Sequence, residues 1–357
     1  PAHQTSILSE SFTPNRTIPM TAAVLVSLTG DEQIKLYDLD PQSGALALHT
    51  TSSTYGPSGA LVFHPNGQVL YDAHVGSSTL AAFRFDVATG EFTLINKVDT
   101  DIATPAHQTT DAAGRFLLTA YYGGGGVTVH RLEEDGAIGL QLQYVDTGKK
   151  AHAILRTEEN FVFVPHVCPT NRTAQFRFDI DTGQLVANEP AFLSPPENEP
   201  GPRHICFHPT NDIAYIVNEQ GNTVTAHRYN KERGTLEIFQ DITTLPTDHT
   251  TGATAHIEVH PNGKWCYASN RGHDSIVGYN IATDGTLSSF GYYPIPASPR
   301  SFNIDPSGTF LYGAGEAVGV LRSYRIDQDS GVLEPLEDYE VGQQPFWVMV
   351  KEIGKNE

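Results

Sequence analysis

Short apolar runs alternate with turn-forming residues along the whole chain. The run Leu61–Phe63, for example, is followed by His64-Pro65-Asn66-Gly67 and then by a second run, Val69–Tyr71. A Pro-Asn-Gly turn between two runs of β-forming residues predicts a hairpin, because proline presets φ and glycine tolerates positive φ. Related turns begin at Asp111, His208, His260 and Asp305. Apolar residues do not recur with the period of a helix, so we expect strands throughout.

A second turn motif, a polar residue followed by glycine and then by a short β-forming run, returns seven times. Its glycines are Gly44, Gly90, Gly136, Gly183, Gly234, Gly285 and Gly331. Successive copies lie 46 to 51 residues apart. Each unit therefore contains a strand, a tight turn, a strand, a loop, a strand, the glycine turn and a last strand. Four-stranded units of this length, repeated radially, are the blades of a β-propeller.

The repeat predicts an all-β protein, a single seven-bladed β-propeller with four-stranded antiparallel blades, over residues 21–350. A pair of β-sandwiches would not explain seven evenly spaced turns. We expect the ring to close by pairing a strand near Ala23–Ser27 with one near Val348–Val350. Residues 1–20 are polar and are interpreted as an N-terminal arm or a remnant of recombinant expression.

Aligning the repeat units shows which equivalent positions, called slots below, hold polar or charged residues that the blade structure does not require. The slot at the start of the first strand holds Ala60, His107, His152, His204, His256 and Ser301 in units one to six. The slot just before it holds Arg203 and Arg300 in units four and six. The slot just past the second strand holds Val75, Tyr122, Val167, Glu219, Arg271 and Glu316. These slots meet at one end of the central channel, so we expect a site built on a rigid scaffold.

The histidines also have a structural interpretation, in which each donates to a carbonyl of a neighbouring blade. Arginines at a channel mouth are costly without an anionic partner, which favours a functional cluster. The histidines of the hairpin turns, His64, His208 and His260, are interpreted as stabilising those turns.

The net charge of the chain limits the kinds of molecule that it is expected to bind. The formal charge of −19 repels the phosphate backbone, so we expect no nucleic-acid partner. The same charge opposes an anionic substrate, so a site for an anion has to supply its own local cations. No apolar run is long enough for a membrane span, and no signal peptide is recognisable, so we expect no membrane partner and a cytoplasmic location.

Cofactor and metal sites are not indicated. Three scattered cysteines argue against a disulfide framework or a zinc site, and we expect them to be buried structural thiols. Four histidines one blade apart should lie on a ring wider than a metal site. We therefore expect no metal and no cofactor. The sequence does not indicate an oligomeric state.

Five segments carry a resemblance to a known family. They are Gly201-Pro202-Arg203-His204, Val217-Asn218-Glu219, the run 268–275, the run 299–305 and the run 342–348. The chain resembles the seven-bladed propeller lactonases, which include bacterial 6-phosphogluconolactonase and fungal 3-carboxy-cis,cis-muconate lactonizing enzyme. The resemblance implies that His152, Arg203, Glu219 and Arg271 are catalytic. Tyr121 stands where many relatives have asparagine, a difference that bears on the particular substrate.

The resemblance implies hydrolysis of a sugar lactone in carbohydrate metabolism, with 6-phosphogluconolactone as the first candidate and a small, anionic lactone as the partner. The two arginines would hold the anion or the oxyanion, and either Glu219 or His152 would activate water. Substrate-binding residues are predicted at His107, His204, His256, Arg300, Tyr122 and Glu316. Three alternatives stay open: a muconate cycloisomerase that uses the same residues, a non-catalytic propeller that binds proteins, and a metal-dependent gluconolactonase mechanism.

Overall fold

The computed structural model describes residues 22–195 and 200–353, and this part of the chain is built from strands without a helix. The strands are β1(Ala22–Leu28), β2(Gln33–Leu39), β3(Leu46–Ser53), β4(Leu61–Phe63), β5(Val69–Ala73), β6(Thr79–Phe85), β7(Phe92–Asp99), β8(Pro105–Thr110), β9(Phe116–Tyr121), β10(Val127–Leu132), β11(Ile138–Val145), β12(Leu155–Arg156), β13(Phe161–His166), β14(Arg172–Asp179), β15(Gln184–Leu193), β16(Pro202–Phe207), β17(Ile213–Asn218), β18(Thr223–Asn230), β19(Thr235–Thr243), β20(Ala253–Val259), β21(Trp265–Arg271), β22(Ser275–Ile281), β23(Leu287–Pro294), β24(Pro299–Ile304), β25(Phe310–Gly315), β26(Val320–Ile326), β27(Leu333–Glu340) and β28(Pro345–Glu352).

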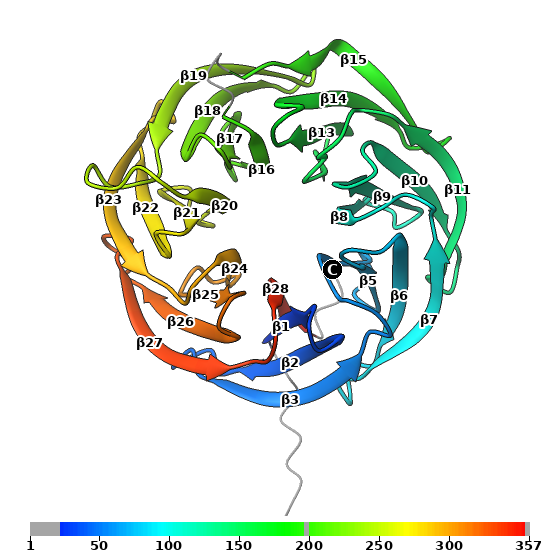
Figure 1. Ribbon diagram of the computed structural model, residues 1–357, viewed down its shortest axis with the longest axis horizontal. Helices are drawn as coiled ribbons and strands as arrows, with labels where there is room; N and C mark the ends of the chain where they lie inside the picture. The colour runs from blue at the N-terminus through cyan, green and yellow to red at the C-terminus, as the bar shows by residue number, and fades with distance from the viewer. Residues whose placement is uncertain (1–21, 196–199, 354–357) are drawn as a thin grey trace, which may run out of the picture.

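These strands form seven four-stranded antiparallel sheets arranged around a central axis (Figure 1). Six sheets follow chain order, from β4-β5-β6-β7 to β24-β25-β26-β27, with the first strand of each nearest the axis. Second strands such as β9 and β17 are buried along their whole length, because both of their faces are covered by neighbouring blades. The seven-bladed β-propeller predicted from the repeat is confirmed.

The seventh sheet joins the two ends of the chain in the order β28-β1-β2-β3. The antiparallel register pairs Val24 with Val350 and Val26 with Val348, as the sequence predicted. The innermost strand of this blade therefore comes from the C-terminal end, and the three outer strands come from the N-terminal part. The described propeller strands run from Ala22 to Glu352. The predicted arm, residues 1–20, lies outside the described residues.

The recurring glycines have a packing role that the turn motif did not reveal. Gly234 adopts a φ of 63°, and a Cβ built there would lie 1.9 Å from Cδ1 of Phe161, the first residue of the second strand in the preceding blade. A side chain is therefore excluded both by the turn and by the neighbouring blade. Four of these glycines also accept a hydrogen bond through their carbonyl oxygens from a buried tyrosine of the preceding blade. The donor and acceptor pairs are Tyr71 and Gly136, Tyr215 and Gly285, Tyr267 and Gly331, and Tyr312 and Gly44.

The hairpin-turn histidines are structural, as predicted. His260 accepts the backbone N–H of Asn262 at Nδ1 (3.2 Å), and its Nε2 donates to the carbonyl of Gly308 in the next blade (2.7 Å). His64 and His208 make the same two kinds of contact. Each of these side chains closes its own turn and ties it to the following one.

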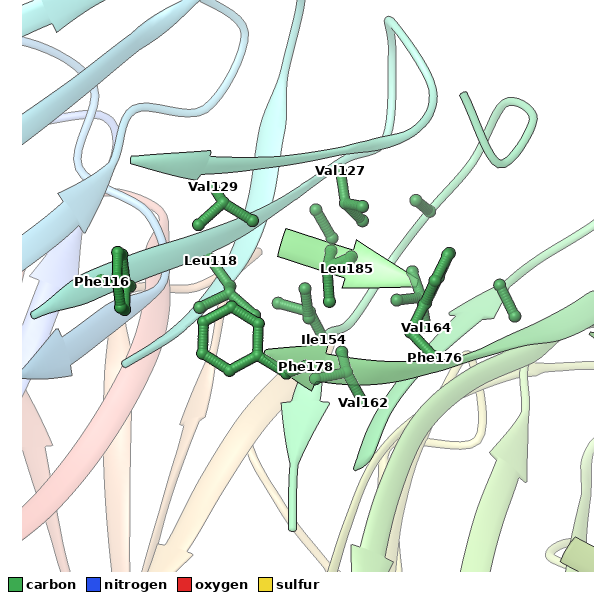
Figure 2. Close-up of a cluster of buried hydrophobic side chains, with 13 residues drawn as sticks. Phe116, Leu118, Val127, Val129, Ile154, Val162, Val164, Phe176, Phe178 and Leu185 are labelled. Carbon is green, nitrogen blue, oxygen red and sulfur yellow. The ribbon is translucent and has the colours of Figure 1, made fainter. Parts of the chain in front are cut away.

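Apolar side chains fill the space between neighbouring blades (Figure 2). In the cluster shown, Phe116 and Leu118 of β9 face Phe176 and Phe178 of β14, and every residue of the set is at most 4% exposed. The cysteines follow the expectation only in part, because Cys266 is buried whereas Cys168 and Cys206 are half-buried. The described residues contain no helix long and apolar enough to cross a membrane.

Candidate active site

Three charged side chains predicted to be catalytic meet at one mouth of the channel. Glu219 follows β17, Arg203 lies in β16, and Arg271 ends β21 of the next blade. Oε2 of Glu219 accepts from Nε of Arg203 at 3.0 Å and from Nη2 of Arg271 at 2.8 Å. Burial alone would raise the pKa of Glu219, but Arg203, Arg271 and Arg300 outweigh it and lower the pKa, which keeps this side chain ionised.

Arg203 lies at a β-bulge, where the register between β16 and β17 shifts. Successive side chains of a regular strand point to opposite faces, and a bulge re-aims one of them. The bulge therefore allows Arg203 and His204 to contact each other, with Nη1 of Arg203 3.2 Å from Nε2 of His204. A similar register shift between Pro299 and Ser301 lies at Arg300. Nothing in the sequence indicated either bulge.

The buried guanidinium of Arg203 is almost fully bonded. The residue is only 1% exposed, and its Nη1 also donates to the carbonyl of Ala255. Burial, together with Arg271 and Arg300, lowers its pKa, and the ion pair with Glu219 opposes that shift. No hydrogen bond joins its Nη2 to another described residue. This nitrogen is the part of Arg203 that remains for a ligand.

Arg300 and Glu316 form a second ion pair at the same mouth, at 3.4 Å. The guanidinium of Arg300 lies over the ring of Phe346, 4.8 Å from its centroid, and its buried Nε has no partner among the described residues. Three guanidinium groups thus face two carboxylates here. The mouth is locally cationic in a chain whose formal charge is −19, as an anion site in such a protein requires.

His152 lies beside this cluster and is only 5% exposed. Its ring packs edge-on against Tyr122 and His204, with centroids 5.5 and 5.1 Å away. Its Nδ1 is buried without a hydrogen-bond partner among the described residues. Burial and the charges of the three arginines lower the pKa of His152 well below its ordinary value of 6.5. His152 is therefore neutral at pH 7 and can accept a proton.

The four channel histidines are closer together than predicted. Nδ1 of His204 is 2.8 Å from Nδ1 of His256, and the ring of His107 lies 5.7 Å from that of His204. The innermost strands point these side chains at the axis, so that the histidine rings contact one another there. Even so, no group of three or more His, Cys, Asp or Glu side chains in the described ranges could hold a metal ion.

Trp347 was missed by the comparison of repeat units. Its ring packs edge-on against His107 and His256, at 5.3 and 5.6 Å, and lies near His204. We call His107, His204, His256 and Trp347 the histidine layer. Trp347 occupies the histidine slot of the seventh blade, where Pro345-Phe346-Trp347 corresponds to Pro202-Arg203-His204. The proline shared by these segments would have revealed it.

A cavity of about 540 Å³ opens on the other side of the histidine layer, towards the hairpin turns. Its walls include the four residues of the layer, together with Ile154, Phe207, Tyr229 and Glu258. Arg203, Glu219 and Arg271 do not line it. The predicted substrate-binding residues therefore fall into two groups. Arg300 and Glu316 form the second ion pair and Tyr122 packs against His152, whereas His107, His204 and His256 face this cavity. Their role in substrate binding stays a prediction.

Comparison with known proteins places the chain among enzymes. A family described as "Lactonase, 7-bladed beta-propeller" matches residues 22–350. The chain is 32% identical to a 6-phosphogluconolactonase from Pectobacterium carotovorum over 93% of its own length and 99% of that protein. It is 30% identical, with the same coverage, to a 6-phosphogluconolactonase from Serratia proteamaculans.

Solved structures show the same architecture. A Bacteroides uniformis protein described as a candidate 6-phosphogluconolactonase superposes with a TM-score of 0.85 at 28% identity, over 93% of this chain and all of that one. The periplasmic gluconolactonase of Pseudomonas aeruginosa gives the same TM-score at 21% identity, over 93% of this chain and 99% of that one, which shows a shared fold.

Proposed function

The chain belongs to the seven-bladed β-propeller lactonase family, and on that premise we propose that it hydrolyses a sugar lactone, with 6-phosphogluconolactone as the first candidate. The observation that carries the proposal is the channel mouth, where three arginines surround one ionised carboxylate and one neutral histidine. This local positive charge suits an anionic lactone. The relatives named 6-phosphogluconolactonase support the same substrate.

Lactone hydrolysis needs a base for water and a group that stabilises the tetrahedral oxyanion. Water adds to the lactone carbonyl carbon as His152 takes one of its protons. Arg203 and Arg271 donate to the carbonyl oxygen as it becomes negative. The bond from this carbon to the ring oxygen then breaks, and the ring oxygen takes the proton from His152. The product is an open-chain hydroxy acid, which loses a proton at neutral pH.

We assign the base to His152 rather than to Glu219. Both oxygens of Glu219 are already bonded, Oε2 to the two arginines and Oε1 to Nε2 of Gln220 at 3.0 Å. Its carboxylate is ionised and holds the arginines in place. His152 is neutral and has an unpartnered ring nitrogen among the described residues. A neutral imidazole whose nitrogen has no other partner can take a proton from water.

Arg271→Ala tests the assignment. Arg271 is better suited than the buried Arg203, because its side chain is 17% exposed and its loss is less disruptive to the fold. Removing one donor to an oxyanion costs about 10²–10³-fold in rate. We expect Arg271→Ala to lower kcat/KM for 6-phosphogluconolactone by that factor, measured above the spontaneous hydrolysis of the lactone.

The matched control is Arg322→Ala, which removes an arginine ion-paired with Asp338 away from the channel mouth. It should keep kcat/KM within about twofold. Wild-type kcat/KM in Arg271→Ala would contradict the role of that arginine. Muconate cyclisation is assayed in parallel, and activity on muconates alone would overturn the sugar-lactone proposal. We also propose a cytoplasmic location.

A further inference from the structure

Glu258 anchors a hydrogen-bonded chain on the cavity side of the histidine layer. The residue lies in β20, and its Oε1 accepts from Nδ2 of Asn303 at 2.6 Å. Its Oε2 accepts from the backbone N–H of Ile304 at 2.9 Å. Oδ1 of Asn303 accepts the backbone N–H of Val350, which fixes the orientation of that amide. The carboxylate of Glu258 therefore faces donors on both oxygens.

The direction of every hydrogen bond beyond Glu258 follows from the two ends of the chain, because a carboxylate only accepts and a guanidinium only donates. Nε2 of His256 lies 3.1 Å from Oε1 of Glu258, and it has to donate because the carboxylate only accepts. At the other end of the chain, Nη1 of Arg203 lies 3.2 Å from Nε2 of His204 and can only donate, so Nε2 of His204 accepts and the ring proton of His204 lies on Nδ1. Nδ1 of His256 faces this proton across 2.8 Å and therefore accepts.

We infer that Glu258 is a positioning residue for Arg203, acting through His256 and His204 across the histidine layer. The inference rests on the proposed function, in which Arg203 stabilises the oxyanion. Glu219 holds Nε of Arg203, and His204 and Ala255 hold Nη1. With these contacts in place, Nη2 is presented to the ligand in one orientation. Glu258 itself lines the cavity, which Arg203 does not, and it is connected to that arginine through the two histidines.

A glutamine at position 258 would disturb the chain in either orientation. With its amide nitrogen towards Ile304, the glutamine would place a donor opposite the backbone N–H of Ile304, which is itself a donor. With the nitrogen towards His256, it would donate to that histidine and reverse the chain. His204 would then carry its proton on Nε2, facing a guanidinium that also donates. Arg203 would lose its acceptor and shift, and a shift of about 1 Å costs about 10²-fold in rate.

The tautomers of the two histidines test the chain without any change to it. In ¹⁵N-histidine-labelled wild-type protein, we expect the proton on Nδ1 of His204 and on Nε2 of His256. The resonances are assigned by their loss in His204→Gln and His256→Gln. A proton on Nε2 of His204, or on Nδ1 of His256, would overturn the inference even if no Glu258 variant folds.

Kinetics of Glu258→Gln test the consequence for catalysis. We expect kcat/KM to fall about 10- to 100-fold, with most of the loss in kcat and with altered His204 and His256 tautomers. Glu158→Gln, the same change at another carboxylate of the cavity, should leave both readouts unchanged. If Glu258→Gln reverses the tautomers of His204 and His256 but keeps the kcat/KM of the wild type, the inference is wrong. If the wild-type protein has no lactonase activity, the proposed function is wrong. The tautomers of His204 and His256 still show in that case whether the hydrogen-bonded chain from Glu258 to Arg203 exists.

Discussion

At the scale of single residues, the charge around His152 decides how it can act. Burial and three arginines keep the imidazole neutral, and the same surroundings make it a weak base in the free protein. An anionic lactone bound among these arginines would offset their charge. The pKa of His152 would then rise towards its ordinary value, so that its basicity increases when the substrate is present.

This environment predicts two different acid limbs in the pH–rate profiles. The limb of kcat/KM reports the free enzyme and should lie below pH 6.5, because the pKa of His152 is lowered there. The limb of kcat reports the complex and should lie at higher pH. The profiles are measured with 6-phosphogluconolactone and corrected for spontaneous hydrolysis. A limb of kcat/KM at or above pH 6.5 would argue against His152 as the base, and His152→Gln should abolish the limb along with most of the activity.

At the scale of elements, neighbouring blades are joined by bonds that the repeat places in register. Tyr267 of β21 is buried, and its hydroxyl donates to the carbonyl of Gly331 in the next blade at 2.7 Å. The same glycine leaves room for the ring of Trp265, the first residue of β21. A strand residue and a turn residue one blade later are therefore coupled, which explains why both recur along the chain.

Tyr267→Phe should therefore destabilise the protein by about 1 kcal/mol, since one buried hydrogen bond is lost while the ring remains. The free energy of unfolding is measured by denaturant titration. Tyr55→Phe is the control, because Tyr55 is 56% exposed, and we expect a change within about 0.5 kcal/mol. Equal stability of the two variants would show that the contact between the blades contributes nothing.

At the scale of the whole molecule, buried histidines make the propeller sensitive to acid. Burial lowers the pKa of His130 and His166 to about 4 and that of His227 to about 3. The unfolded chain binds these protons from about pH 6.5 downwards, whereas the folded protein does not. The unfolded state thus holds more protons in this window, and stability falls as the pH drops from 6.5 towards 4.

His227→Leu isolates this effect. The residue is 3% exposed, and its Nδ1 has no partner among the described residues. Removing it should reduce the loss of unfolding free energy between pH 7 and pH 4 by up to about 3 kcal/mol. Thermal unfolding at several pH values measures the difference. Parallel curves for wild type and variant would show that His227 does not contribute to the acid sensitivity.

The sequence by itself determined the number of blades, the strands within them and the slots that meet at the channel. These features are local, because turn chemistry and the alternation of apolar runs are set by neighbouring residues. Comparison of repeat units then identified Arg203, Glu219 and Arg271 as a cluster, because equivalent positions of a radial repeat meet at the axis. The hairpin-turn histidines were interpreted correctly because one of their contacts lies within the turn, whereas the bond from Nε2 to the next blade was not predicted.

Only the tertiary structure decided how these residues are connected. The bulge at Arg203 and the contact between His204 and His256 depend on strand pairing and on the approach of neighbouring blades, which no single unit encodes. Trp347 enters the histidine layer because the ring closes through β28, a contact between the two ends of the chain. Trp347 and the three histidines then line the cavity, whereas Arg203, Glu219 and Arg271 do not.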